Sequence, residues 1–271
     1  MNGRIAKGWK KVKARGYSRD WENYRDLLIV LVQKELKVRY NNKAIGYLWS
    51  IASPLTSALV YYIALQVFMR VQIPDYALIL LSGIFPWQWL SNAIGSSPNL
   101  FIGNAGIIKK VNFPRNIVLL CSVLNHMIHF LISIPVLLFF ILLFHHTPTI
   151  EWLYGIPILT VIQLVLVYGI GIFLATINLF FRDLERLTSI LLNFIFYFTP
   201  ILYPLEQIPA TYLKFIWLNP FAPLIVAWRE LFLYGNFDAQ NAFYSSIYAI
   251  VFFFVGQLTY RKLSWKFAEL I

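Results

Sequence analysis

Residues 103–117 read GNAGIIKKVNFPRNI and form a short basic stretch between two long uncharged runs. The stretch carries three basic residues and no acidic one. The runs on either side, 76–108 and 116–150, contain no Asp, Glu, Lys or Arg. Because about 18 or more consecutive apolar residues predict a membrane-spanning helix, we expect a loop between two spans. We call residues 103–117 the basic elbow.

The basic elbow has two readings. Short loops rich in Lys and Arg stay in the cytoplasm, so Lys109, Lys110 and Arg115 orient the adjacent helices. Pro114 lacks an N–H and biases Phe113 away from the helical region. This pattern predicts a helix–break–helix shape that a cytoplasmic partner can push. On charge alone, a loop that only orients the protein is favoured over such a docking site.

Composition identifies an integral membrane protein. The 271 residues are 59% hydrophobic and 13% charged, whereas soluble domains carry about a quarter charged residues. Long separated apolar blocks favour helices over the alternating pattern of a barrel. We attribute the net charge of +11 to membrane topology and anionic headgroups, and expect no nucleic-acid partner. The single cysteine, Cys121, excludes an intrachain disulfide and is expected to be a small core residue.

Residues 1–43 are expected to form a cytoplasmic basic tail, since they hold twelve Lys and Arg against four acids. Apolar side chains recur there at spacings of three and four, which predicts an amphipathic helix in the membrane interface with Trp21 as an anchor. The alternative is a surface helix of a soluble cap, for which the tail is too short. The apolar positions are Tyr24, Leu27, Leu28, Leu31, Val32 and Leu36.

Residues 44–271 are expected to form an all-α domain of six transmembrane helices. Pro86 and Pro98 predict that the second span is kinked or divided into two pieces. His126 and His129 share a helix face, but a metal site would need more ligands nearby, so buried hydrogen-bonded histidines are favoured over a metal site. The spans are expected within 44–69, from 76 onward, within 116–145, within 152–181, at 187–205 and at 239–260.

Residues 206–238, here called the outer segment, have a different pattern. Their uncharged stretch 215–228 has 14 residues, too few to cross a hydrocarbon core about 30 Å thick. We therefore predict a re-entrant or interfacial hairpin between spans five and six. Arg229 is expected to have a buried partner, with Glu230 as the nearest candidate.

The distribution of basic residues predicts the orientation. Twenty of the 23 Lys and Arg lie in the two tails, the basic elbow and the turn 182–186. The other three are Arg70, Lys214 and Arg229. Because basic loops stay in the cytoplasm, both termini are expected on the cytoplasmic side.

The sequence lacks the motifs of nucleotide binding, of common hydrolases and of proton-coupled transport. No GxxxxGK[ST], HExxH or GxSxG motif occurs. The spans also lack the Asp/Glu relay that a proton-coupled transporter uses. The sequence therefore predicts a conduit, without enzyme activity or a metal site, that is moved by an external motor.

The order of motifs resembles the permease subunits of type-2 ABC exporters, specifically those that export lipid-linked O-antigen polysaccharide or teichoic acid. Only the region before residue 20 lies outside the resemblance. One departure is Asn112, where the family often has Tyr. The matching motifs are Arg39-Tyr40, Gly46-Tyr47-Leu48-Trp49 with Pro54, Gly83 with Pro86-Trp87, 109–115, Phe181-Arg182-Asp183, Pro200-Ile201-Leu202-Tyr203-Pro204 with Pro209, and Asn219-Pro220 with Arg229.

The resemblance implies a homodimer in the bacterial cytoplasmic (inner) membrane, bound to two copies of an ABC ATPase that holds ATP and Mg. It implies no cofactor in this chain. The resemblance also favours an ATPase-docking site at the basic elbow over a loop that only orients the protein. We assign ATPase coupling to Lys109, Lys110, Phe113, Pro114, Arg115, Arg39, Arg182 and Asp183. We assign an outer gate to Pro204, Pro209, Asn219, Pro220, Arg229 and Glu230.

The substrate is expected to be a glycan, because 48 residues are aromatic, more than interface belts require. The alternative for these rings is anchoring in lipid. Other functions kept open are a permease of the same fold for a drug or small lipid, and a membrane-bound glycosyl- or acyltransferase. The expected path residues are Tyr61, Tyr62, Phe68, Trp87, Trp89, Phe196, Tyr197 and Phe198.

Overall fold

Apolar blocks of the chain fold as long helices joined by short turns in this computed structural model, which describes residues 26–33, 46–109 and 113–267. Those residues form helices and no strand, as the sequence predicts. Residues 26–33 are helical. The further elements are α3 (Gly46–Tyr62), η2 (Ile63–Phe68), α4 (Tyr76–Ser96), α5 (Leu100–Gly103), α6 (Ala105–Ile108), α7 (Asn116–Leu143), α8 (Glu151–Asn178), α9 (Leu184–Phe198), η3 (Leu205–Gln207), α10 (Ala210–Ile216), α11 (Ala222–Arg229), η4 (Glu230–Tyr234), α12 (Ala239–Leu263) and η5 (Ser264–Lys266).

Four helices of the described residues are long and apolar enough to span a membrane. They are α4, α7, α8 and α12 extended by η5. The first expected span appears as α3 continued by the π-helical η2, and the fifth as α9 with 15 residues. The structure thus gives a multi-pass helical membrane protein.

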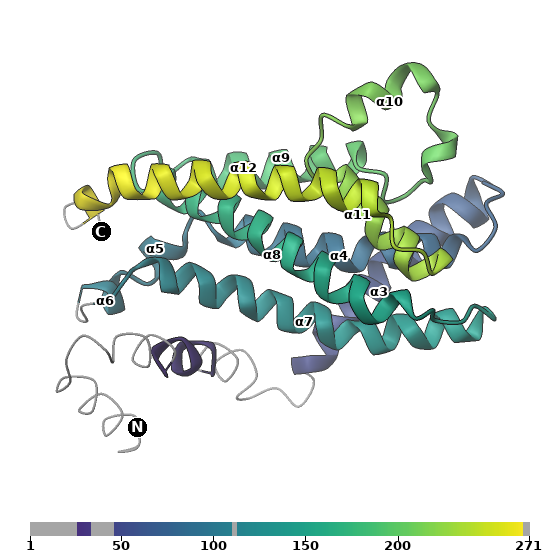
Figure 1. Cartoon of the computed structure of the whole chain (residues 1–271), viewed down its shortest axis with the longest axis horizontal. Helices are drawn as coiled ribbons and strands as arrows, with labels where there is room; N and C mark the ends of the chain where they lie inside the picture. Colours follow the sequence, from purple (N-terminus) through teal and green to yellow (C-terminus); the bar gives the residue numbers. More distant parts are fainter. Residues whose placement is uncertain (1–25, 34–45, 110–112, 268–271) are drawn as a thin grey trace.

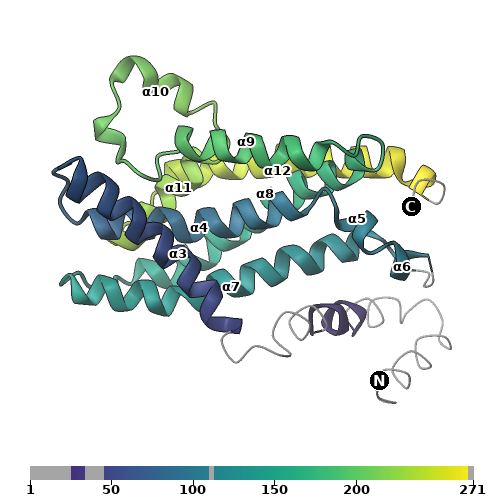
Figure 2. The ribbon, with the colours of Figure 1, turned by 180° about the vertical axis from the view of Figure 1, so that it is seen from behind.

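Connections between the helices gather at two ends of the bundle. Figure 1 shows α5, α6 and the C-terminal end of α12 at one end, and α10 at the other. Three connections meet at the α10 end: His146 Nε2 lies 3.0 Å from Asp75 Oδ2, and Thr149 Oγ1 donates to Gly235 O. Figure 2 shows from behind that α3 runs obliquely across the bundle.

The helix at 26–33 packs on the start of α7, beside which both views place it (Figures 1 and 2). Leu31 is buried with Ile117 and Cys121, and Leu28 packs against them. The predicted apolar face and the core position of Cys121 are confirmed. Tyr24 and Leu36 lie outside the described residues.

Two prolines of the second span have different effects. α4 continues through Pro86, so the chain does not divide there, and it ends at Ser96, just before Pro98. Side chains of α8 bind both proline carbonyls: Gln163 Nε2 donates to Pro86 O at 2.9 Å, and Asn178 Nδ2 to Pro98 O at 2.9 Å. These two bonds join α8 to the middle of α4 and to the turn that follows α4.

Helices α8 and α12 make the most extensive helix pair because two glycines let their backbones approach. A Cβ built on Gly169 would lie 2.5 Å from the backbone nitrogen of Phe253. A Cβ on Gly256 would collide with the Gly169 carbonyl oxygen and lie 2.5 Å from Ile172 Cγ2. Any larger side chain must therefore separate the two helices.

We expect Gly256→Ala to destabilise the protein by about 1–3 kcal/mol, because overpacking a tight crossing forces backbone shifts. Thermal unfolding of the purified protein in detergent measures the effect as a lower melting temperature. Gly106→Ala is the matched control, since a Cβ there has no neighbouring atom within 4 Å. Equal melting temperatures for the two variants would contradict the tight crossing.

Candidate functional site

The basic elbow combines two short helices, an exposed cation and an exposed proline. α5 and α6 are separated at Asn104, and α7 starts after Pro114, so the predicted helix–break–helix shape is observed. Lys109 and Pro114 are exposed, whereas Phe113 is half-buried. Arg39 and Lys110 lie outside the described residues.

Arg115 points into the protein. Its Nη1 donates to the carbonyl oxygen of Ser264 at 3.0 Å, and its guanidinium lies 5.6 Å from the ring centroid of Phe267. Phe267 is fully buried and packs on Phe101 of α5 at 5.3 Å between ring centroids. The C-terminal turn after α12 is therefore fastened to the basic elbow, a contact that sequence reasoning missed.

The turn between α8 and α9 lies toward the same end as α5 (Figure 1). Arg182 and Asp183 in this turn are exposed. Together with Lys109, they are available to a partner at this end of the bundle, while Arg115 is already engaged within the chain.

Three of the expected path rings form one cluster across α3, α4 and α9. Trp87 lies 5.7 Å from Phe196 between ring centroids, and Tyr61 lies 5.6 Å from Phe196. Phe196 also contacts Tyr197 at 5.2 Å. Tyr197, Phe198 and Phe68 are exposed, with 59%, 68% and 77% of their surface accessible. We call Tyr61, Trp87, Phe196, Tyr197 and Phe198 the aromatic face.

Trp89 and Tyr62 lie elsewhere. Trp89 is 2% exposed and stacks on Phe130 of α7 at 5.3 Å, so it belongs to the packed core. It follows Trp87 by two residues, which turns it to another side of α4. Tyr62 stacks on Tyr76 at 6.4 Å. Neither residue is part of the aromatic face.

Arg229 of the outer segment is buried, with 3% of its surface exposed. Its Nη2 donates to Pro200 O at 2.6 Å and Ile201 O at 3.0 Å, and its Nη1 to Tyr203 O at 3.1 Å. The hydroxyl of Tyr76 donates to Leu202 O at 2.9 Å. Four successive carbonyls after α9 are therefore bound by side chains of α11 and α4.

The prediction that Arg229 has a buried partner is confirmed, but the prediction that Glu230 is this partner is wrong. Among the described residues, the hydrogen bonds of Arg229 go to backbone carbonyls, and Glu230 begins η4 half-buried. A buried guanidinium needs hydrogen-bond acceptors, and the free carbonyls after α9 supply them.

Asn219 forms the turn that starts α11. Its Nδ2 donates to Thr199 Oγ1 at 2.8 Å, and its Oδ1 accepts from the backbone N–H of Phe221 at 3.0 Å. Pro220 is half-buried, and Pro204 and Pro209 flank η3. Asn219 and Arg229 thus hold the end of α9 from both ends of α11.

The stretch 215–228, expected to be a hairpin, divides into two environments. Phe215 and Leu218 are exposed, with 66% and 72% of their surface accessible. In contrast, every residue of α11 is buried, against α4, α8 and α12. Trp228 Nε1 donates to Gln163 Oε1 at 2.7 Å, so Gln163 joins α11 to the Pro86 carbonyl of α4. A lone amide in an apolar helix is the signal that could have identified Gln163.

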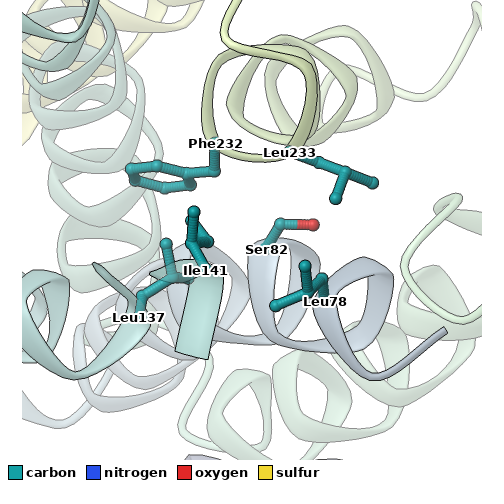
Figure 3. A pocket seen from close by; sticks show the side chains of 6 residues that line it. All are labelled: Leu78, Ser82, Leu137, Ile141, Phe232 and Leu233. Carbon is teal, nitrogen blue, oxygen red and sulfur yellow. The ribbon is translucent and has the colours of Figure 1, made fainter. Parts of the chain in front are cut away.

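A small recess lies between α4, α7 and η4 (Figure 3). Its volume of about 150 Å³ is below the range of about 300–1,000 Å³ for ligand pockets. Ser82, its one polar lining residue, donates its hydroxyl to Ile79 O. The recess is thus a packing gap. In the described residues no group of three or more His, Cys, Asp or Glu could hold a metal ion.

Comparisons with known proteins match nearly the whole chain. The family model described as "ABC-2 type transporter" matches residues 26–233. An O-antigen export system permease protein RfbA of Klebsiella pneumoniae is 44% identical over 91% of this chain and 95% of its own length. A Myxococcus xanthus protein of the same name is 31% identical over 93% and 98%. The polysialic acid transport protein KpsM of Escherichia coli is 24% identical over 85% and 91%.

We expect Arg229→Gln to destabilise the protein by about 3 kcal/mol or more, since it removes charged hydrogen bonds and leaves buried carbonyls unpaired. Tyr76→Phe removes one neutral bond and should cost about 1 kcal/mol. Thermal unfolding measures the loss of stability, and backbone hydrogen exchange over 199–205 measures the local loosening. Arg70→Gln at an exposed site is the control. If residues 199–205 exchange at the wild-type rate in Arg229→Gln, Arg229 does not hold the backbone that follows α9.

Proposed function

The chain belongs to the ABC-2 type transporter family, and on that basis we propose that it is the membrane subunit of an ATP-driven exporter of lipid-linked polysaccharide of the O-antigen type. The observation that carries the proposal is 44% identity to an O-antigen export permease over 91% of the chain. Similarity to a polysialic acid transport protein supports polysaccharide as the substrate class. The drug, small-lipid and transferase alternatives have no comparable support.

ATP hydrolysis in this proposal belongs to a separate ATPase present in two copies, which holds ATP and Mg. The chain supplies no P-loop motif. Its exposed Lys109, Arg182 and Asp183, all at one end of the bundle, are the docking surface. A displacement of the basic elbow is transmitted to α12 through the contacts of Arg115 and Phe267. From α12 it is transmitted to α8, because the two helices are in close contact at Gly169 and Gly256.

Six spans and cytoplasmic termini are part of the proposal. α3 and η2 continue one another over 17 and 6 residues, about 35 Å at about 1.5 Å per residue, enough for the hydrocarbon core. α9 is the shortest candidate, and the chain continues from it into residues 199–203. The excess of Lys and Arg at the α5 end supports that end as cytoplasmic in the inner membrane.

The proposed exporter is a homodimer whose subunits meet along α9. Only Thr188 of this helix is buried, and its outward side chains are large and apolar. The aromatic face borders this surface, so two copies would enclose a path lined by rings. Rings can hold the C–H faces of sugars weakly, and conduction needs contacts weak enough to release. The outward apolar side chains of α9 are Leu187, Ile190, Leu191, Phe194, Tyr197 and Phe198.

The outer segment is proposed as the gate of this path. Arg229 and Asn219 connect α11 to the end of α9, so movement of α9 also moves the outer segment. We propose that 206–238 dips into the outer leaflet around this fixed point, with the exposed Phe215 and Leu218 in the interface.

Replacing Lys109 and Lys110 together by Glu should abolish export, because it reverses the charge of the proposed ATPase-docking loop. Export is measured as surface polysaccharide in a strain whose own copy of the gene is deleted, and ATPase binding by co-purification. We expect normal membrane insertion with loss of both. Arg70→Glu, an exposed charge reversal outside both the proposed docking surface and the proposed gate, is the control. Normal export by the double variant would overturn the docking assignment.

Tyr197→Ala should lower export while leaving the dimer intact, because it removes one exposed ring of the aromatic face. Phe254→Ala on α12 is a matched control, since both rings are 59% exposed. Export is measured as above, and the dimer by crosslinking in membranes. If Tyr197→Ala, alone and combined with Phe196→Ala, exports at the wild-type level, the aromatic path is wrong.

A further inference from the structure

Helix α12 presents one uncharged face over most of its length. Its exposed side chains recur at spacings of three and four, which puts them on one side of the helix. The opposite side, with Ala249 and Gly256, is buried, and α8 packs against α12. The exposed apolar residues are Phe243, Tyr244, Ile247, Ile250, Val251, Phe254, Val255 and Leu258.

The length of this face matches a bilayer. Phe243 and Arg261 are about 27 Å apart along the helix axis at about 1.5 Å per residue, close to a hydrocarbon core about 30 Å thick. Leu258 is the last exposed apolar residue before Arg261. Acyl chains are therefore the partner that fits the face.

Basic and aromatic side chains continue the same face beyond Leu258. Arg261 follows Leu258 by three residues and Trp265 follows Arg261 by four, and Lys262 lies beside them. Arg261 and Lys262 are exposed, and Trp265 is 68% exposed. The ammonium of Lys266 lies 5.0 Å from the Trp265 ring centroid. Tryptophan is favoured at the boundary between acyl chains and headgroups.

These cations have their charge available. In the part of the chain that the structure describes, no carboxylate lies within ion-pair distance of Arg261, Lys262 or Lys266. Arg115 at the same end differs, because it already donates to Ser264 O. As far as the described residues go, an oxyanion at the headgroup level would therefore meet two or three cations that have no carboxylate beside them.

We propose that Arg261, Lys262 and Lys266, together with Trp265, form a binding site for an anionic phospholipid. Acyl chains lie along the apolar face of α12, and the phosphate accepts hydrogen bonds from Arg261 and Lys262. The Trp265 ring occupies the boundary between them. The inference goes beyond the exporter function, since binding requires neither the ATPase nor polysaccharide.

The test reconstitutes the full chain in vesicles of phosphatidylcholine and phosphatidylglycerol, one of which carries brominated acyl chains. Subtracting the spectrum of Trp265→Phe isolates the fluorescence of Trp265. Brominated phosphatidylglycerol should quench this fluorescence more strongly than brominated phosphatidylcholine. Each basic side chain near an anionic surface contributes about a fivefold preference, so Arg261→Gln with Lys262→Gln should lower the preference at least about tenfold.

Native mass spectrometry of phosphatidylglycerol adducts gives a second readout that needs no tryptophan variant. Arg70→Gln with Lys214→Gln is the matched control, because it removes two exposed charges at the opposite end. This control should keep the lipid preference. Equal preference in wild type and the Arg261/Lys262 variant would overturn the proposal.

Two further outcomes separate the lipid from other partners. Inorganic phosphate, compared with chloride at equal ionic strength, should leave the quenching unchanged, since it has no acyl chains. Competition by phosphate would overturn the lipid assignment in favour of a soluble anion. An Arg261/Lys262 variant that keeps lipid preference but loses the co-purified ATPase would show that the patch is a protein-docking surface instead.

Discussion

A carbonyl oxygen without a donor is costly inside an apolar bundle, and this requirement determines how the helices of the protein meet. Helix ends release carbonyl acceptors, and side chains of neighbouring helices can donate to carbonyls there or along a helix. Gln163 and Asn178 of α8 bind the carbonyls of the two prolines of the second span. Tyr76 and Arg229 bind the carbonyls that follow α9. Long polar side chains therefore join helices of this largely apolar bundle.

These hydrogen bonds connect some helices of the protein more extensively than others. Trp228, Gln163 and the Pro86 carbonyl connect α11, α8 and α4 in series, and the glycine crossing adds α12 to the same unit. Asn219 and Arg229 bind the residues that follow the C-terminal end of α9, and α9 is exposed along most of its length. In the proposed exporter, α9 is therefore free to change its neighbours while the unit around α8 stays intact.

Much of the fold could be predicted because apolar blocks and charge specify helices and their connections. The shape of the basic elbow follows from Pro114 and the uncharged runs beside it, and the apolar face of 26–33 follows from spacing; both are observed. The partner of Arg229 could not be predicted, since backbone carbonyls have no side-chain signature in a sequence. The length of 215–228 excluded a span but could not distinguish the buried α11 from the exposed α10.

The positions of the expected path residues also could not be predicted from the sequence alone. Trp87 and Trp89 are equivalent in composition, yet one borders α9 and the other stacks on Phe130. Which side of α4 faces the core depends on α7 and α11, which lie far away in the sequence. Arg115 likewise has the charge of a docking residue, whereas its hydrogen bond to Ser264 turns it inward.

The carbonyl contacts of Arg229 have a consequence for how relatives can diverge. Its acceptors are main-chain atoms of residues 200, 201 and 203, and every amino acid supplies such an atom. Side chains at those positions can therefore change without a compensating change at 229. Methods that infer contacts from correlated substitutions depend on two side chains that change together. They would therefore miss the contact between Arg229 and these carbonyls. The strongest link between α9 and α11 would then appear in an alignment only as an isolated invariant arginine.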